Sequence, residues 1–208
     1  LPPCRFTPAS GPAPRSPLSN QPADYLIVAH PSFISGLAPL VAARRAEGFA
    51  VQVVDVEDVY DAYTDGVVDP AAISALIADA VSQLGTRYVL LVGGDTYDYF
   101  DYTGAHSQSF IPTHYRAIGP VIRHTPTDVP YADIDGDGMQ DVAIGRLPVR
   151  TQSELALWLG KLDVYSTGSY GGRLLRVSDR RLGSVDYGAE LGALNFSLNG
   201  YATTRIAL

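Results

Sequence analysis

The sequence predicts an α/β fold in which a mainly parallel sheet is covered by helices on both faces. Three short runs predict strands. Residues 25–29 and 88–92 have the length and the continuous hydrophobicity of strands buried on both faces, and Val51, Val53 and Val54 mark the other strand. Two segments with apolar residues at helical spacing separate these runs. The order strand, helix, strand, helix, strand is typical of parallel strands joined by crossover helices.

The expected helices have recognisable ends. The first carries apolar residues at helical spacing over residues 37–43 and ends at Gly48. The second begins with Asp69 as N-cap and Pro70 at the first helical position, and it stops at Gly85. The other elements expected from such signals are a helical turn at 56–63, a strand at 142–145, a helix opened by a Thr151–Glu154 capping box, a strand at 174–177, a helix at 187–198 and a strand from residue 201.

Prolines mark two segments in which regular structure is not expected. Residues 1–23 contain seven prolines and are predicted to form a linker or tail ahead of the first strand. Residues 106–130 contain four prolines and are predicted to be irregular. The only cysteine, Cys4, lies in the tail, so the chain forms no intrachain disulfide.

Charge and hydropathy argue against nucleic acid as the main partner and against a membrane-spanning segment. The formal net charge is -7, from 15 basic and 22 acidic residues, which argues against nucleic acid as the main partner. No apolar run approaches the length of a membrane span, so no membrane-spanning helix is expected. No signal peptide is visible at the start of the sequence.

A dense acidic loop, Asp-Ile-Asp-Gly-Asp-Gly-Met-Gln-Asp, lies directly before the strand expected at 142–145. Alternating carboxylates with glycines between them predict a site for a hard divalent cation, most simply Ca²⁺. Position 12 is Ile144, where an EF-hand needs glutamate, so the loop is a shorter variant with a structural role. A metal-free acidic turn is the alternative, and Mg²⁺ is a weaker candidate ion. The expected ligands are the carboxylates of Asp133, Asp135, Asp137 and Asp141 and the main-chain carbonyl of Met139.

The third strand runs into Gly93-Gly94-Asp95, followed by an aromatic loop at residues 97–102. Ligands of open α/β sheets bind at the carboxyl ends of the strands, so Asp95 and Tyr97 are candidates for a substrate cleft. A turn or helix-capping role for Asp95 and simple packing of the tyrosines are the alternatives. The loop matches neither a dinucleotide fingerprint nor a phosphate-binding loop.

Three histidines, His106, His114 and His124, lie in the proline-rich segment. Their spacing matches no zinc pattern and no cysteine accompanies them, so solvated or capping roles are expected.

Several stretches together resemble one known family, the gingipain-type cysteine peptidases. The stretches are residues 24–31, 53–61, 88–98, 111–113 and 131–149. The resemblance implies a caspase-like three-layer sandwich, in which residues 24–168 form the first α/β subdomain and residues 169–208 a truncated start of the second. It also implies a secreted, extracellular or cell-surface endopeptidase that acts on peptide or protein substrates.

The resemblance implies no catalytic residue within this chain. The family uses a histidine in a Gly-His-Gly segment and a later cysteine, and neither follows residue 24 here. The chain therefore looks like the N-terminal part of a catalytic domain, inactive alone and dependent on the remainder of that domain. Asp141 is the position that would match a carboxylate that orients the catalytic histidine.

Two other function classes remain open from the sequence. The acidic loop is also similar to the calcium loops of propeller repeats in adhesion proteins, which would make the chain a non-catalytic calcium-binding module. Only one copy occurs, amid α/β patterning, which weighs against a propeller. A flavodoxin-like or hydrolase domain acting at Gly93–Asp95 would need a phosphate cradle or a nucleophile elbow, and the sequence has neither.

Overall fold

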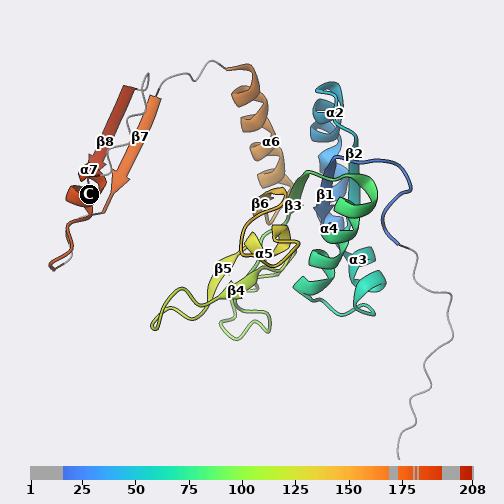
Figure 1. Ribbon diagram of the computed structural model, residues 1–208, viewed down its shortest axis with the longest axis horizontal. Coiled ribbons are helices and arrows are strands. Elements are labelled where there is room, and N and C mark those ends of the chain that lie inside the picture. Colours follow the sequence, from blue (N-terminus) through green and yellow to red (C-terminus); the bar gives the residue numbers. More distant parts are fainter. Residues whose placement is uncertain (1–15, 169–172, 180, 182, 194–201, 208) are drawn as a thin grey trace, which may run out of the picture. The chain divides into compact units, whose positions relative to one another are not determined.

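The computed structural model describes residues 16–168, 173–179, 181, 183–193 and 202–207 (Figure 1). By packing, the chain divides into two compact units, Leu1–Leu159 and Gly160–Leu208. The first unit contains β1 (Tyr25–Ala29), α1 (Pro31–Ile34), the 3-10 helix η1 (Ser35–Leu37), α2 (Ala38–Ala46), β2 (Val51–Asp55), α3 (Val56–Tyr63), α4 (Pro70–Leu84), β3 (Tyr88–Val92), β4 (His114–Arg116), β5 (Thr125–Thr127), α5 (Val129–Ala132), β6 (Ala143–Leu147) and the start of α6 (Gln152–Thr167). The second contains the rest of α6, then β7 (Arg173–Ser178), α7 (Tyr187–Ala193) and β8 (Ala202–Ala207).

The first unit is built on a four-stranded parallel sheet in the order β2-β1-β3-β6, which confirms the predicted α/β fold. The central strand β1 pairs on both sides, so that Ile27 lies between Val53 and Leu90. Its residues 26–29 are fully buried, which explains why this segment reads as a continuous apolar run.

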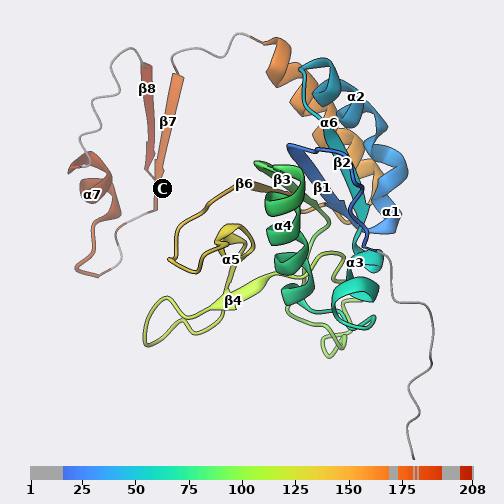
Figure 2. The same ribbon diagram turned by 45° about the vertical axis from the view of Figure 1, so that its right-hand side comes forward.

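Helices cover both faces of this sheet. Leu26 and Val28 belong to one apolar cluster with Ile73 and Leu76 of α4. Figure 2 shows the sheet between α4 on one side and α1, α2 and the start of α6 on the other. The unit is therefore a three-layer sandwich.

The close contact between η1 and the start of α6 depends on a glycine. A Cβ atom on Gly36 would lie 2.9 Å from Cδ2 of Leu155, which is fully buried. Gln152 donates a hydrogen bond to the carbonyl of Ser32 at the same contact.

The predicted helix ends are largely as expected. The Asp69 carboxylate accepts a hydrogen bond from the Ala71 N–H at 2.8 Å, and Gly85 ends α4 with φ +74°. At α6, the Thr151 hydroxyl accepts from the Glu154 N–H. The Glu154 carboxylate instead accepts from the N–H of Arg150, one residue before the position that a capping box requires.

The prediction that residues 106–130 are irregular is wrong in part. The strands β4 and β5 pair as an antiparallel hairpin, and α5 follows at once. Each strand has only three residues, too few to give an alternating pattern, and Pro126 lies inside β5 opposite Tyr115.

Ordered packing also begins earlier than Asp24. Leu18 and Ala23 are buried in the apolar core, and the Ala23 N–H donates to the carbonyl of Leu84. Prolines exclude a helix here, but an extended segment can still bury its apolar side chains. Residues 1–15, including Cys4, lie outside the described part of the chain.

The second unit contains a two-stranded parallel sheet, in which Leu175 of β7 is opposite Thr204 of β8. The helix predicted at 187–198 is observed as α7 (Tyr187–Ala193), and the later residues of that prediction fall outside the described range. Packing divides the chain inside α6, between residues 159 and 160, and the subdomain boundary at residue 168 that the resemblance implies stays a prediction. Among the helices described, none has the length and hydrophobicity needed to cross a membrane.

Candidate functional site

The order of the strands indicates where a ligand would bind to such a sheet. The chain leaves β1 toward β2 on one side and returns as β3 on the other, so the topological switch point lies between the carboxyl ends of β1 and β3. This point is filled by the chain itself. The His30 ring lies 5.0 Å from the ring of Phe110, and a Cβ on Gly93 would lie 2.8 Å from Cβ of Phe110.

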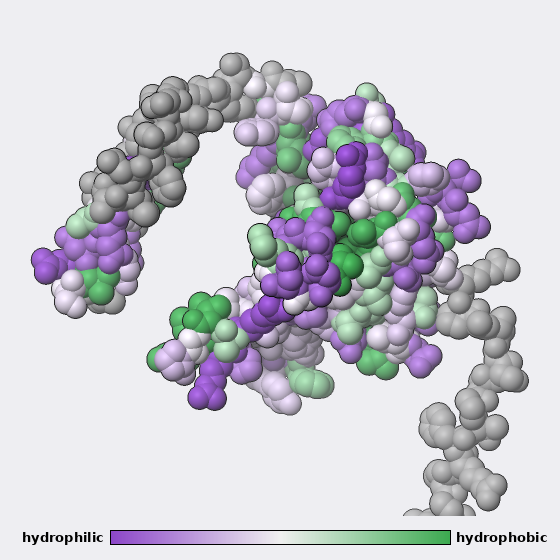
Figure 3. Space-filling model, in the orientation of Figure 1, coloured by the Kyte–Doolittle hydropathy of each residue, from purple (hydrophilic) through white to green (hydrophobic). Residues whose placement is uncertain are grey.

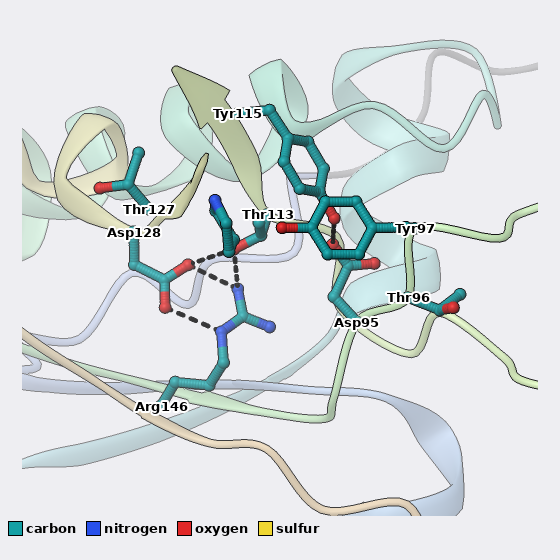
Figure 4. A pocket seen from close by; sticks show the side chains of 9 residues that line it. Asp95, Thr96, Tyr97, Thr113, Tyr115, Thr127, Asp128 and Arg146 are labelled. Atoms are coloured by element: carbon teal, nitrogen blue, oxygen red, sulfur yellow. Dashed lines mark hydrogen bonds and ion pairs between the residues drawn. The ribbon is translucent and has the colours of Figure 1, made fainter. Parts of the chain in front are cut away.

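A pocket lies next to this point, beyond the carboxyl ends of β3 and β6 (Figure 4). Its volume is about 290 Å³, and side chains come from the loop after β3, from the β4–β5 hairpin and from β6. The lining residues are Asp95, Thr96, Tyr97, Thr113, Tyr115, Pro126, Thr127, Asp128 and Arg146. Both predicted cleft residues, Asp95 and Tyr97, are among them.

A largely buried ion pair forms one wall of the pocket. Arg146 of β6 is 12% exposed and donates two hydrogen bonds of 2.8 Å to the carboxylate of Asp128, one to each oxygen. The same guanidinium donates to the carbonyls of Gly93, Ile111 and Pro112 at 2.7–3.0 Å. Arg146 therefore joins β6 to the loop after β3 and to the start of the hairpin.

The two charges stabilise one another inside the protein. Burial alone would raise the pKa of Asp128, but the hydrogen bonds and charge of Arg146 outweigh it, and the pKa is lowered from its ordinary value. Burial likewise opposes the charge of Arg146, but Asp128 outweighs it and the pKa of Arg146 is raised.

Asp95 forms the opposite wall, and it caps no helix in the described chain. Its carboxylate accepts hydrogen bonds from the hydroxyls of Tyr99, Ser109 and Tyr115 at 2.7–3.1 Å. Burial and the neighbouring carboxylate raise the pKa values of Tyr99 and Tyr115, so both remain hydrogen-bond donors. The Tyr97 ring lies 5.0 Å from that of Tyr115 and is 66% exposed at the rim.

Two of the three histidines in the proline-rich segment at residues 106–130 are solvent-exposed as predicted, and His114 is not. The His106 side chain is 89% exposed and pairs with Asp101 at 2.7 Å, and His124 is also exposed. His114 is half-buried, with Nε2 at 3.3 Å from the Ser74 hydroxyl and its ring 4.6 Å from that of Tyr131. It attaches the hairpin to α4 and α5.

We expect His114 to make stability depend on pH. Burial lowers its pKa, the charge of Arg116 acts in the same direction, and the carboxylates of Asp128 and Asp69 oppose them. Because the folded state disfavours protonation of His114, the neutral ring contributes to the free energy of unfolding. This contribution is complete above the unfolded pKa of about 6.5 and decreases as the pH falls below it. Urea unfolding at about pH 7.5 and about pH 5 measures the loss.

The matched variants are His114→Gln and His124→Gln. The first should show a smaller stability difference between the two pH values than the wild-type chain, and the second should keep the wild-type difference. Equal behaviour of the two variants would contradict the assignment to His114.

The acidic loop lies directly before the amino end of β6, whereas the pocket lies beyond the carboxyl ends of β3 and β6. Carboxylate oxygens of Asp133, Asp135 and Asp141 all lie within 4.8 Å of one another. One oxygen of Asp133 is buried without a hydrogen-bond partner. Asp141 accepts from the Ile134 N–H at 2.7 Å, which holds the loop closed.

Asp137, a fourth predicted ligand, is arranged differently. The Asp137 carboxylate accepts a hydrogen bond from the Met139 N–H at 2.7 Å and is not part of the converging group. The role expected for the main-chain carbonyl of Met139 stays a prediction. Asp141 precedes β6, whereas the pocket lies beyond the ends of β3 and β6, so its suggested role in orienting a histidine stays a prediction.

The most connected residue of the site, Arg146, was not identified from the sequence. A signal existed, because an arginine within an apolar strand must find a partner when it is buried. Its partner Asp128 gives no such signal, since it lies in a segment that was predicted to be irregular.

Comparisons with known proteins were made on the sequence and on the fold. A family model described as peptidase family C25 matches residues 18–202. Among solved structures, dimeric latent PorU from Porphyromonas gingivalis is similar with a TM-score of 0.57 and 22% identity, over 69% of this chain and 15% of that chain. A second, described as "Structure of Protease", is similar with a TM-score of 0.53 and 20% identity, over 74% of this chain and 31% of that chain.

These likenesses support the caspase-like α/β fold. The chain spans less than a third of the length of either structure. Comparison with curated protein sequences gave no match.

Proposed function

Because the chain belongs to peptidase family C25, the gingipain family, we propose that it forms the N-terminal part of the catalytic domain of a secreted cysteine endopeptidase. The observation that carries this proposal is the family match over residues 18–202, which includes both the sheet and the pocket. The substrate is a peptide or protein, and the enzyme acts outside the cell or at its surface.

In the proposed enzyme, this chain and the remainder of the domain supply different parts of the active site. A cysteine peptidase needs a thiolate, a histidine that transfers the proton and donors for the oxyanion. The single cysteine of this chain is Cys4, at the opposite end from the expected catalytic region, and there is no Gly-His-Gly segment. The catalytic pair therefore belongs to a later part of the domain, and Asp95 and Tyr97 border the substrate cleft.

The acidic loop is proposed to hold a structural Ca²⁺ ion. Three carboxylates converge, and one oxygen of Asp133 is buried with no donor, as expected for a ligand whose partner is a cation. Asp133 directly follows α5, and Asp141 lies two residues before β6. An ion bound by both residues would link the end of α5 to the start of β6 and would reduce the repulsion between the carboxylates.

A thiol-trapping peptidomimetic on the complete protein tests the peptidase proposal. Labelling of one cysteine beyond residue 208 is expected, and it should persist in a Cys4→Ser variant. The 208-residue chain with Cys4→Ser should neither be labelled nor cleave peptides. Absence of labelling in the complete protein would contradict the proposal and favour a non-catalytic, calcium-binding adhesion or binding module.

A further inference from the structure

The tip of the β4–β5 hairpin exposes three aliphatic side chains. Ile118, Val121 and Ile122 are 66%, 88% and 55% exposed. The Ile118 N–H donates a hydrogen bond to the Ile122 carbonyl at 3.1 Å, which closes the turn. The hairpin extends away from the sheet in Figure 1, and Figure 3 shows apolar surface at the same place beside strongly hydrophilic surface.

The segment that carries this tip has a charge opposite to that of the whole chain. Residues 103–127 contain no aspartate or glutamate, although the chain has 22 acidic residues and a net charge of -7. The exposed side chains of Arg116, Arg123 and His124 flank the apolar turn. The tip is therefore apolar at its end and basic at its base.

A second pair of exposed aliphatic residues provides a contrast. Val67 and Val68 are 62% and 56% exposed, but they lie between Asp65 and Asp69. Exposure of aliphatic side chains alone is common on protein surfaces. The combination with arginines and without nearby acids along the chain distinguishes the hairpin from this second pair.

We propose that the hairpin tip docks on an anionic lipid surface. Three aliphatic side chains on a protruding turn offer far less than the ~800 Å² per partner that a stable protein interface buries. A bilayer needs no matching pocket, since its interface accepts aliphatic groups while its anionic headgroups attract arginine. This proposal does not depend on the peptidase assignment.

Vesicle sedimentation with the complete protein, and with the 208-residue chain beside it, tests the proposal. Vesicles of equal parts phosphatidylglycerol and phosphatidylcholine should bind the chain, and pure phosphatidylcholine vesicles should bind it less. The triple variant Ile118→Ser, Val121→Ser, Ile122→Ser should lose at least tenfold in partitioning. The variant Arg116→Ser, Arg123→Ser should lose about fivefold for each arginine removed.

The control is Val67→Ser with Val68→Ser, which should bind like the wild-type chain, and the melting temperature of every variant reports its folding. Binding that needs Ca²⁺ and survives the hairpin changes would show bridging through acidic residues and overturn the proposal. No vesicle binding would overturn it, as would self-association that the triple variant removes, because that result assigns the tip to a protein interface.

Discussion

Replacing Arg146 by methionine is expected to lower the free energy of unfolding by about 3–5 kcal/mol, the usual cost of leaving one partner of a buried ion pair alone. The side chain is 12% exposed and makes a bidentate pair with Asp128. Methionine has a similar length but no donors. The variant therefore leaves the largely buried carboxylate of Asp128 and three main-chain carbonyls without the guanidinium that they contact.

The matched control is Arg150→Met. Arg150 is exposed and donates to the carbonyls of Asp95 and Gln108, so the same change of charge should cost less than about 1 kcal/mol. Urea unfolding of both variants measures the difference. Similar losses in the two variants would show that Arg146 contributes only surface charge.

The ion pair also predicts how the wild-type chain responds to acid. The pKa of Asp128 is lowered in the folded state, so its contribution is complete above the unfolded value of about 3.9 and is lost as the pH falls through the folded pKa. Arg146→Met should lack this acid step, because the lowered pKa depends on the guanidinium.

The sheet was predictable because its signals are local. Each of the strands β1, β2 and β3 is a run of five residues that carries its own apolar pattern, and Asp69, Pro70 and Gly85 mark the ends of α4 within single turns. The chain order then leaves few arrangements for parallel strands.

The pocket was only partly predictable, because its contacts are made between distant segments. Asp95 was identified from its position after β3, but its three hydroxyl partners come from a loop and a hairpin with no periodic pattern. The pair between Asp128 and Arg146 spans 18 residues and depends on the way the chain folds back through α5. The density of carboxylates in the sequence was enough to predict the acidic loop. Which of these carboxylates converge depends on the path of the backbone, and Asp137 is not among them.

Removal of calcium is expected to lower the melting temperature by roughly 5–10 °C. An ion at about 100 times its dissociation constant stabilises the folded state by about 2.7 kcal/mol, and about 1 kcal/mol corresponds to about 2–4 °C for a chain of this size. Thermal unfolding in saturating Ca²⁺ and in EDTA measures the difference. An unchanged melting curve would mean that the loop is a metal-free acidic turn.

Two substitutions distinguish the possible sets of ligands. Asp133→Asn changes the residue whose buried oxygen lacks a donor, while its amide oxygen can still accept from the Gly138 N–H. This variant should lose most of the response to Ca²⁺ and should be at least as stable as the wild-type chain in EDTA, because one of the repelling charges is gone.

Asp137→Asn keeps an acceptor for the Met139 N–H and changes a carboxylate outside the converging group. A response to Ca²⁺ close to that of the wild-type chain would limit the ligands to Asp133, Asp135 and Asp141. Loss of the response in both variants would restore the four-carboxylate set predicted from the sequence. In that case the loop must move on binding, since Asp137 has to exchange its main-chain hydrogen bond for the ion.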